Sequence, residues 1–219
     1  MSNEENRFPL APGAYWTFFE TIDEDLYAYS RYLEFHEKNF SAFSINLARL
    51  YLSICSEVDV LAKMICRRDV PSSDPWNIGD YRQIIIKRYP LFPYFWVNIK
   101  QVCTIQPWEE WITTTDKNPG WWGDHNDVKH HRNEFFYKAN LQNVLGSAAG
   151  LLVMLVYWYG DQIQGRHLIP RFKTLELHPS LDMEILTGIF RSENPHPGSI
   201  PKETLTPIRA RQLAERNQS

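Results

Sequence analysis

The chain has 219 residues, which is enough for one domain with a sizeable hydrophobic core and too few for two full domains. Its composition, 43% hydrophobic and 22% charged residues, is typical of a folded globular protein and excludes a disordered chain. With 23 Lys and Arg against 26 Asp and Glu the formal net charge is -3, so any contact with a nucleic acid has to be local.

Several features of the sequence predict a cytoplasmic protein without a membrane span. The three cysteines, Cys55, Cys66 and Cys103, include no CxxC pair and cannot form a disulfide framework, which fits a reducing compartment. The N-terminus has neither a basic start nor an apolar core and is therefore not expected to be a secretory signal. The most apolar run, 144–159, is interrupted by small residues and is shorter than the roughly 20 residues that cross a bilayer. We expect this run to be a buried central helix.

Apolar residues recur at helical spacing in the first third of the chain. We expect a first helix over 22–38, with Thr21 and Glu24 as a capping box at its start. The next helix starts near Ser41 or Ser44 and carries apolar residues in alternating steps of three and four. It is the clearest amphipathic helix of the chain.

Prolines divide the middle of the chain. The amphipathic helix ends by Pro71, and a shorter helix around 78–88 follows, which Pro90 stops. Residues 90–118 combine prolines with aromatic and β-branched side chains, which favours a short strand or an extended arm over a helix.

Helical signals return in the second half. Asn118 and Pro119 match an N-cap followed by proline at the first helical position, and they predict a helix that runs through the polar segment 124–132. A second start between 133 and 138 leads into a long apolar helix over about 139–164.

Beyond the long apolar helix the signals weaken, and residues 172–177 indicate at most one strand. We therefore predict an all-α fold, a bundle of four to five helices with a core over about 22–164 and a small extended or β insertion around 90–118. One helical domain would occupy 1–192, followed by a flexible C-terminal tail over 193–219.

The polar segment 124–132 holds three of the seven histidines together with a lysine, an arginine and two carboxylates. On a helix His125 would neighbour Lys129, and Asn126 would neighbour His130, because residues four apart share one side. A histidine can move the proton of a ribose hydroxyl, and a cation can stabilise charge on phosphate. The segment therefore fits RNA cleavage without a metal ion. The alternative is a solvated, capped turn at the exposed start of a helix.

Asn126-Asp-Val-Lys-His130, followed by Arg132 and a long apolar helix, resembles the motif region of HEPN domains. These are helical bundles found in many prokaryotic RNases, toxins and antiphage systems. The family's pattern is an arginine, usually followed by a polar residue such as asparagine, with a histidine four to six residues beyond the arginine. Asn126 and His130 match the asparagine and histidine positions, whereas His125 stands at the arginine position.

A second register takes Arg132 and Asn133 as the arginine and asparagine and places Tyr137 at the histidine position. We prefer the first register. There Lys129 and Arg132 could supply the missing cation near His130, whereas a tyrosine with its ordinary pKa is a poor base at neutral pH.

The resemblance implies a HEPN-like RNA-binding or metal-independent RNA-cleaving protein of toxin or antiphage-defence type. His130 would transfer the proton, with Lys129 and Arg132 as the catalytic cations on the phosphate. His125 and Asn126 would bind and position the substrate. The family's sites commonly form across a homodimer, so the resemblance also implies a dimer, no cofactor, and an antitoxin or defence component as partner. The competing function is a non-enzymatic helical interaction or nucleotide-binding protein with a catalytically silent motif.

Glu57 lies on the shoulder of the apolar stripe in the amphipathic helix, where a carboxylate needs a partner. One interpretation pairs it with Lys129, His130 or Arg132, so that it supports the site. The other is a structural salt bridge to any neighbouring base. The sequence leaves both open.

A metal site is a further alternative, because His125, His130, His131 and Asp124 include ligand types for zinc. On one straight helix His130 and His131 point about 100° apart. No HExxH or Cys/His pair is present, so the sequence predicts no metal site.

Four tryptophans could stack on bases, but buried packing is the commoner fate of such rings, and we expect it here. They are Trp108, Trp111, Trp121 and Trp122.

Overall fold

The computed structural model describes residues 13–71, 76–100, 102–113, 117–159 and 172–177. Within these ranges the chain is mainly helical, with seven α-helices and one three-stranded antiparallel sheet. The expected combination of a helical fold with a small β insertion is confirmed. The predicted tail over 193–219 lies outside the described residues.

The helices are α1 (Ala14–Tyr29), α2 (Ile45–Arg67), α3 (Ile78–Arg88), α4 (Glu110–Thr113), α5 (Gly120–His130), α6 (Arg132–Phe135) and α7 (Leu141–Tyr159). Short 3-10 turns occupy Glu37–Asn39, Phe92–Tyr94 and Phe136–Lys138. The strands are β1 (Val97–Ile99), β2 (Cys103–Ile105) and β3 (Leu175–Leu177), in the sheet order β2-β1-β3.

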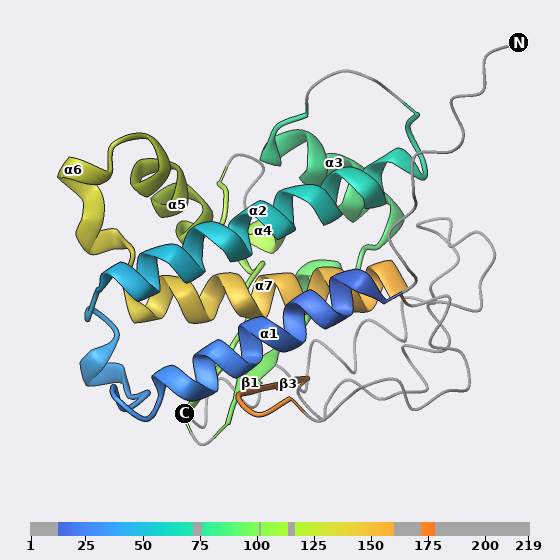
Figure 1. The fold of residues 1–219 in the computed structure, drawn as a ribbon. Helices are drawn as coiled ribbons and strands as arrows, with labels where there is room; N and C mark the ends of the chain where they lie inside the picture. Colours follow the sequence, from blue (N-terminus) through green and yellow to red (C-terminus); the bar gives the residue numbers. More distant parts are fainter. Residues whose placement is uncertain (1–12, 72–75, 101, 114–116, 160–171, 178–219) are drawn as a thin grey trace, which may run out of the picture.

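The helices α2 and α7 run side by side and in the same direction through the middle of the molecule (Figure 1). Near their N-terminal ends Phe43 forms an isolated bridge with Asn140. Near their C-terminal ends the Arg68 side chain donates a hydrogen bond to the backbone carbonyl of Trp158 at 3.0 Å. The helix α1 crosses in front of this pair, and α5 and α6 cover one end of it.

The helices α2 and α3 start where the sequence predicts, because both have side-chain caps. Ser44 Oγ accepts a hydrogen bond from the backbone N–H of Leu47 at 3.1 Å, which satisfies one of the free donors at the start of α2. Asn77 and Asp80 form a reciprocal capping box at the start of α3.

The prediction for the first helix was wrong at both ends, since α1 runs from Ala14 to Tyr29 and not over 22–38. Thr21, expected as a cap, lies inside the helix, and its hydroxyl donates to the carbonyl of Phe18 at 2.6 Å. The buried stripe of α1 already begins at Phe19, so packing extends the helix ahead of the apparent capping box.

The helix α7 is the buried central helix that the sequence predicts, with every residue except Gln142 and Trp158 buried. Among the described helices it alone is long and apolar enough to cross a membrane, but 83% of that apolar window is buried inside the molecule, as in a core helix. Its predicted last residues, 160–164, lie outside the described part.

The four tryptophans are buried, as expected, and the rings of Trp108 and Trp121 pack against α7. The exposed fractions are 0% for Trp108, 4% for Trp111, and 7% for both Trp121 and Trp122. A Cβ atom on Gly150 would lie only 2.8 Å from Cζ2 of Trp121, so the glycine lets the indole lie directly against the helix backbone. The small residues that interrupt the apolar run are therefore packing sites.

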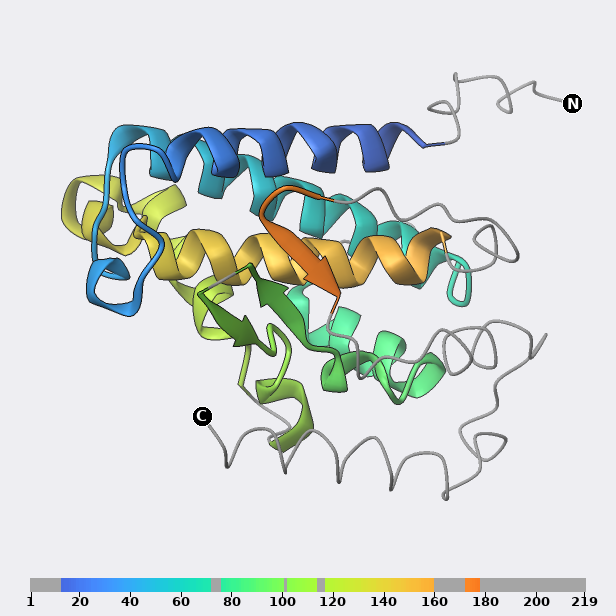
Figure 2. The same ribbon diagram turned by 90° about the horizontal axis from the view of Figure 1, so that it is seen from below.

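The sheet lies on the side of α7 opposite α2 (Figures 1 and 2). Its strand β3 is held by Asp23 of α1, which is buried and accepts hydrogen bonds from the backbone N–H groups of Thr174 at 2.9 Å and Leu175 at 3.1 Å. These bonds satisfy a buried carboxylate and fix residues distant in sequence to the first helix.

Candidate functional site

The polar segment lies on α5 and on the turn that follows it. The helix starts at Gly120, one residue later than the sequence predicts, with Pro119 as its N-cap. It ends at His130, and the backbone of His131 (φ -135°, ψ 41°) breaks the helix before α6 begins at Arg132. The buried side of α5 is formed by Trp121, Trp122, His125 and Val128. Burial therefore divides the polar segment between the interior and the surface.

His125 belongs to the interior, and the expectation that it binds substrate has to be corrected. Its side chain is only 5% exposed and lies between two aromatic rings, with centroid distances of 5.8 Å to Tyr51 and 5.4 Å to Trp122. Burial, together with the charges of Lys129 and His130, lowers the pKa of its imidazole to about 4. The ring is a neutral packing element and is not open to a ligand on the surface.

We expect this burial to make folding sensitive to pH between about 6.5 and 4. In the unfolded chain the imidazole has its ordinary pKa of 6.5, whereas in the folded protein its pKa is about 4, so within this window only the unfolded chain binds the proton. The stability that the neutral imidazole gives to the folded state is fully present above pH 6.5 and is lost as the pH falls toward 4.

Urea unfolding of the wild type and of His125→Phe at pH 7 and pH 5 tests this expectation. Between pH 7 and pH 5 the free energy of unfolding of the wild type should fall by about 1–2 kcal/mol more than that of the variant. One pH unit within the window corresponds to roughly 1.4 kcal/mol. An equal loss in both proteins would contradict the assignment of a buried neutral imidazole.

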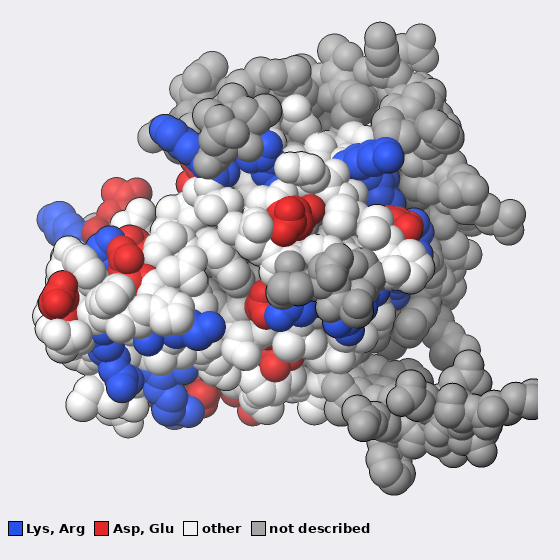
Figure 3. Space-filling model, turned by 90° about the horizontal axis from the view of Figure 1, so that it is seen from above, with Lys and Arg blue, Asp and Glu red and all other residues white. Residues whose placement is uncertain are grey.

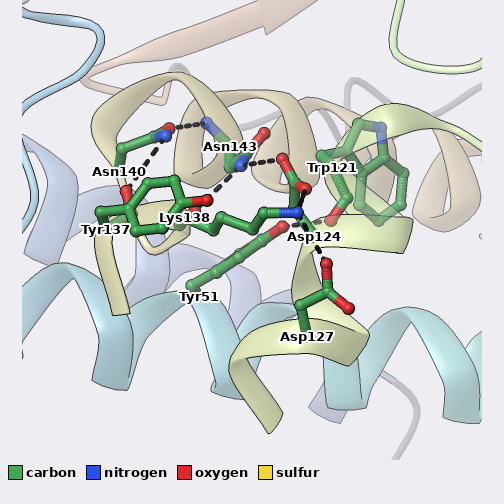
Figure 4. A network of polar contacts seen from close by, with 8 residues as sticks. All are labelled: Tyr51, Trp121, Asp124, Asp127, Tyr137, Lys138, Asn140 and Asn143. Carbon is green, nitrogen blue, oxygen red and sulfur yellow. Dashed lines mark hydrogen bonds and ion pairs between the residues drawn. The ribbon is translucent and has the colours of Figure 1, made fainter. Parts of the chain in front are cut away.

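The two carboxylates of the segment are bound by a lysine that the sequence analysis missed (Figure 4). Lys138 Nζ lies 2.8 Å from Asp124 and 2.6 Å from Asp127, and these hydrogen bonds raise the pKa of the ammonium above its ordinary value. The Asn143 side chain donates to Asp124 and to the backbone carbonyl of Lys138, both at 2.9 Å. The network ties the connection before α7 to α5 and neutralises the acidic half of the segment.

Tyr51 of α2 also holds α5, through a contact next to Lys138 (Figure 4). Its hydroxyl is buried and donates a hydrogen bond to the backbone carbonyl of Trp121. Burial raises the pKa of this phenol above its ordinary value, with Cys55, Asp124 and Asp127 adding to the effect. Because Tyr51 falls within the apolar stripe of its helix, the sequence pattern marks it only as a core residue.

The remaining side chains of the segment are exposed at the corner between α5 and α6. They are Asn126, Lys129, His130, His131 and Arg132. Neither Lys129 nor Arg132 forms an ion pair with any residue that the structure describes. On the face drawn in Figure 3 basic and acidic side chains are interspersed, so the charge available to a ligand is a local one.

Glu57 does not join this corner. The carboxylate is half-buried, which raises its pKa, and its charge acts on Tyr15 of α1. Residues two apart on a helix point about 200° apart, and Asp59 accordingly faces another way. Asp59 accepts a hydrogen bond from Tyr81 at 2.8 Å and forms an ion pair with Lys63.

Ligand-type side chains do not gather in the described part of the chain, where no group of three or more His, Cys, Asp and Glu is placed to hold a metal ion. The ligand types considered from the sequence are dispersed, with His125 buried and Asp124 paired with Lys138. Cys55 and Cys66 are buried in α2 as free thiols.

Comparison with known proteins identifies no relative. No protein-family model matches the sequence, no curated protein matches it, and no solved structure matches the chain. A functional assignment therefore depends on the geometry of α5 and α6 and on the resemblance of residues 126–132 to the HEPN motif.

Proposed function

We propose that the protein is a HEPN-like RNA-binding protein that cleaves RNA without a metal ion, in a toxin or antiphage-defence setting. The observation that supports this most directly is the exposed corner that carries Lys129, His130 and Arg132 within four residues of the sequence. Both carboxylates of the segment are withdrawn into ion pairs with Lys138, so they repel a phosphate less strongly. The corner thus combines a proton-transfer group with unpaired cations.

In the proposed reaction His130 accepts the proton of a ribose 2′-hydroxyl. The oxygen attacks the adjacent phosphorus, the bond to the 5′-oxygen breaks, and the protonated His130 gives its proton to that oxygen, so the products are a 2′,3′-cyclic phosphate and a 5′-hydroxyl. Lys129 and Arg132 stabilise the negative charge that develops on the phosphate oxygens. Each step uses only side chains of the corner and the RNA itself.

We further propose the HEPN-like bundle and the homodimer that the resemblance implies. The helices α1, α2, α5 and α7 would be the HEPN-like bundle, with α5 and the following turn carrying the motif. A homodimer would bring two such corners together, and an antitoxin or a defence component would regulate them. Light scattering after size-exclusion chromatography measures the oligomeric state directly.

We expect the purified protein to cut RNA in a buffer that contains EDTA. Arg132→Ala should bind RNA more weakly and should reduce the salt dependence of binding, with the slope of log K against log salt falling by about 0.7 for the loss of one phosphate contact on a single strand. Arg67→Ala, which removes an exposed arginine at the far end of α2, is the matched control and should leave the slope unchanged.

The competing function is a non-enzymatic interaction or nucleotide-binding protein. The burial of His125 favours it, because no cation stands at the family's arginine position. In that case the wild type would cut no RNA under any condition, and His130→Ala and Arg132→Ala would both weaken binding of one protein or nucleotide partner.

A further inference from the structure

Four rings lie in a row that begins at the proposed proton-transfer residue. The ring row consists of His130, His131, Phe135 and Tyr137, whose successive centroids are 6.5, 6.4 and 6.5 Å apart. Successive ring planes are inclined by 58°, 81° and 56°, so no two neighbouring rings are stacked face to face. Both histidines are exposed, Phe135 is half-buried, and Tyr137 is 52% exposed.

The ring row is held in place from the interior. Lys138, which follows it in the chain, forms ion pairs with two carboxylates of α5 and places its ammonium 5.1 Å from the centre of the Phe135 ring. Behind the row Phe136 packs edge-on against Phe43 at 5.6 Å, and Phe43 is itself 51% exposed. The rings are thus positioned before any ligand arrives, which lowers the entropy lost on binding.

The exposed rings of His130, His131 and Tyr137, beside cations that form no ion pair with any described residue, match a ligand in which bases and phosphates alternate. Aromatic and histidine rings stack on unpaired bases, whereas in a duplex the neighbouring bases cover those faces. Lys129 and Arg132 flank the start of the row and can meet the phosphates. An acidic peptide would satisfy the cations but would leave the rings without a partner.

We propose that the ring row is a stacking track for the bases of single-stranded RNA, leading away from the bond at His130. This inference rests on the proposed function and specifies its substrate: the RNA has to be single-stranded next to the bond that is cut. Tyr137, the most distant ring, binds a base and does not transfer a proton.

The test measures binding by fluorescence polarisation in EDTA, with a labelled RNA of roughly 12 nucleotides that carries 2′-O-methyl groups and cannot be cleaved. Tyr137→Ala should weaken binding about 5- to 160-fold, since stacking contributes roughly 1–3 kcal/mol per base. Tyr137→Phe keeps the ring and should bind like the wild type. Tyr32→Ala removes a tyrosine that is 88% exposed outside the row, and it should have no effect.

Two further measurements distinguish base stacking from phosphate binding and test the second register of the motif. Tyr137→Ala should leave the salt dependence of binding unchanged, because a phenol neutralises no phosphate, whereas Arg132→Ala should reduce it. Tyr137→Phe also lacks the hydroxyl that the second motif register would need, so cleavage by this variant excludes that register. His131→Ala, at another exposed ring, provides a second variant should Tyr137→Ala fold poorly in a thermal melt.

The outcomes distinguish the two proposals. Binding of single strands that depends on Tyr137, without any cleavage by the wild type, would support the stacking track and defeat the proposed reaction. Cleavage by the wild type together with unchanged binding by Tyr137→Ala, or with equal affinity for a duplex of the same sequence, would overturn the track alone. Absence of binding to either RNA, or self-association through this surface in its place, would overturn both.

Discussion

Replacing Leu152 with aspartate is expected to prevent folding. Leu152 lies in the middle of α7 and is only 1% exposed. Removing a large apolar side chain from a core costs about 2–5 kcal/mol, and a buried carboxylate without a partner costs several kcal/mol more. Together these penalties approach or exceed the roughly 5–15 kcal/mol that stabilises a typical domain.

The expected result is insoluble protein, or soluble protein without a cooperative thermal transition in circular dichroism. Leu155→Asp should behave in the same way, since Leu155 is fully buried in the same helix. Gln142→Asp is the matched control, because Gln142 is exposed in the first turn of α7, where a carboxylate is favourable. A soluble Leu152→Asp variant that unfolds cooperatively at the wild-type temperature would refute the central position of this helix.

The second large effect concerns catalysis. His130→Ala should lower the rate of RNA cleavage by roughly a hundredfold or more, because general acid or base catalysis typically contributes that much. The thermal melt should stay unchanged, since the side chain is exposed and, among the described residues, its ring contacts only that of His131. Binding of the uncleavable RNA should weaken far less than the rate, because the lost interaction belongs mainly to the proton-transfer step.

Single-turnover cleavage of a labelled RNA in EDTA checks this expectation. His36→Ala is the control, because it removes an exposed histidine outside the α5–α6 corner. Equal rates for the wild type and His130→Ala would end the catalytic assignment and would point to a contaminating nuclease or to another residue.

Local signals in the sequence predict those helices whose ends have their own caps. Ser44 and Asn77 fix the starts of α2 and α3, and the apolar length of α7 identifies the core. The first helix is different, because Thr21 and Glu24 imitate a cap inside a helix whose length is set by packing. The sheet could not be predicted in full, since β1 pairs with β3, whose residue Leu177 lies 80 positions after its partner Val97, and no local pattern encodes such a partner.

The sequence predicted which segment carries the candidate site, but not how the side chains of the site are arranged in space. The spacing of His125 with Trp121, Trp122 and Val128 is the three-and-four pattern of a buried face, and this pattern could have indicated that the histidine is internal. The role of Lys138 had no comparable signal. It pairs with α5 only because the chain breaks at His131 and turns back before α7.

During translation, the buried carboxylate of Asp23 in α1 has to wait for the residues that bind it. Its hydrogen bond to the Thr174 backbone joins residues 151 apart, so during translation α1 leaves the ribosome long before its partners have been made. Until then the carboxylate has to remain hydrated, because burying it unpaired would cost several kcal/mol. The attachment of α1 through Asp23 is therefore completed only after residues 174–175 at the start of β3 have been made.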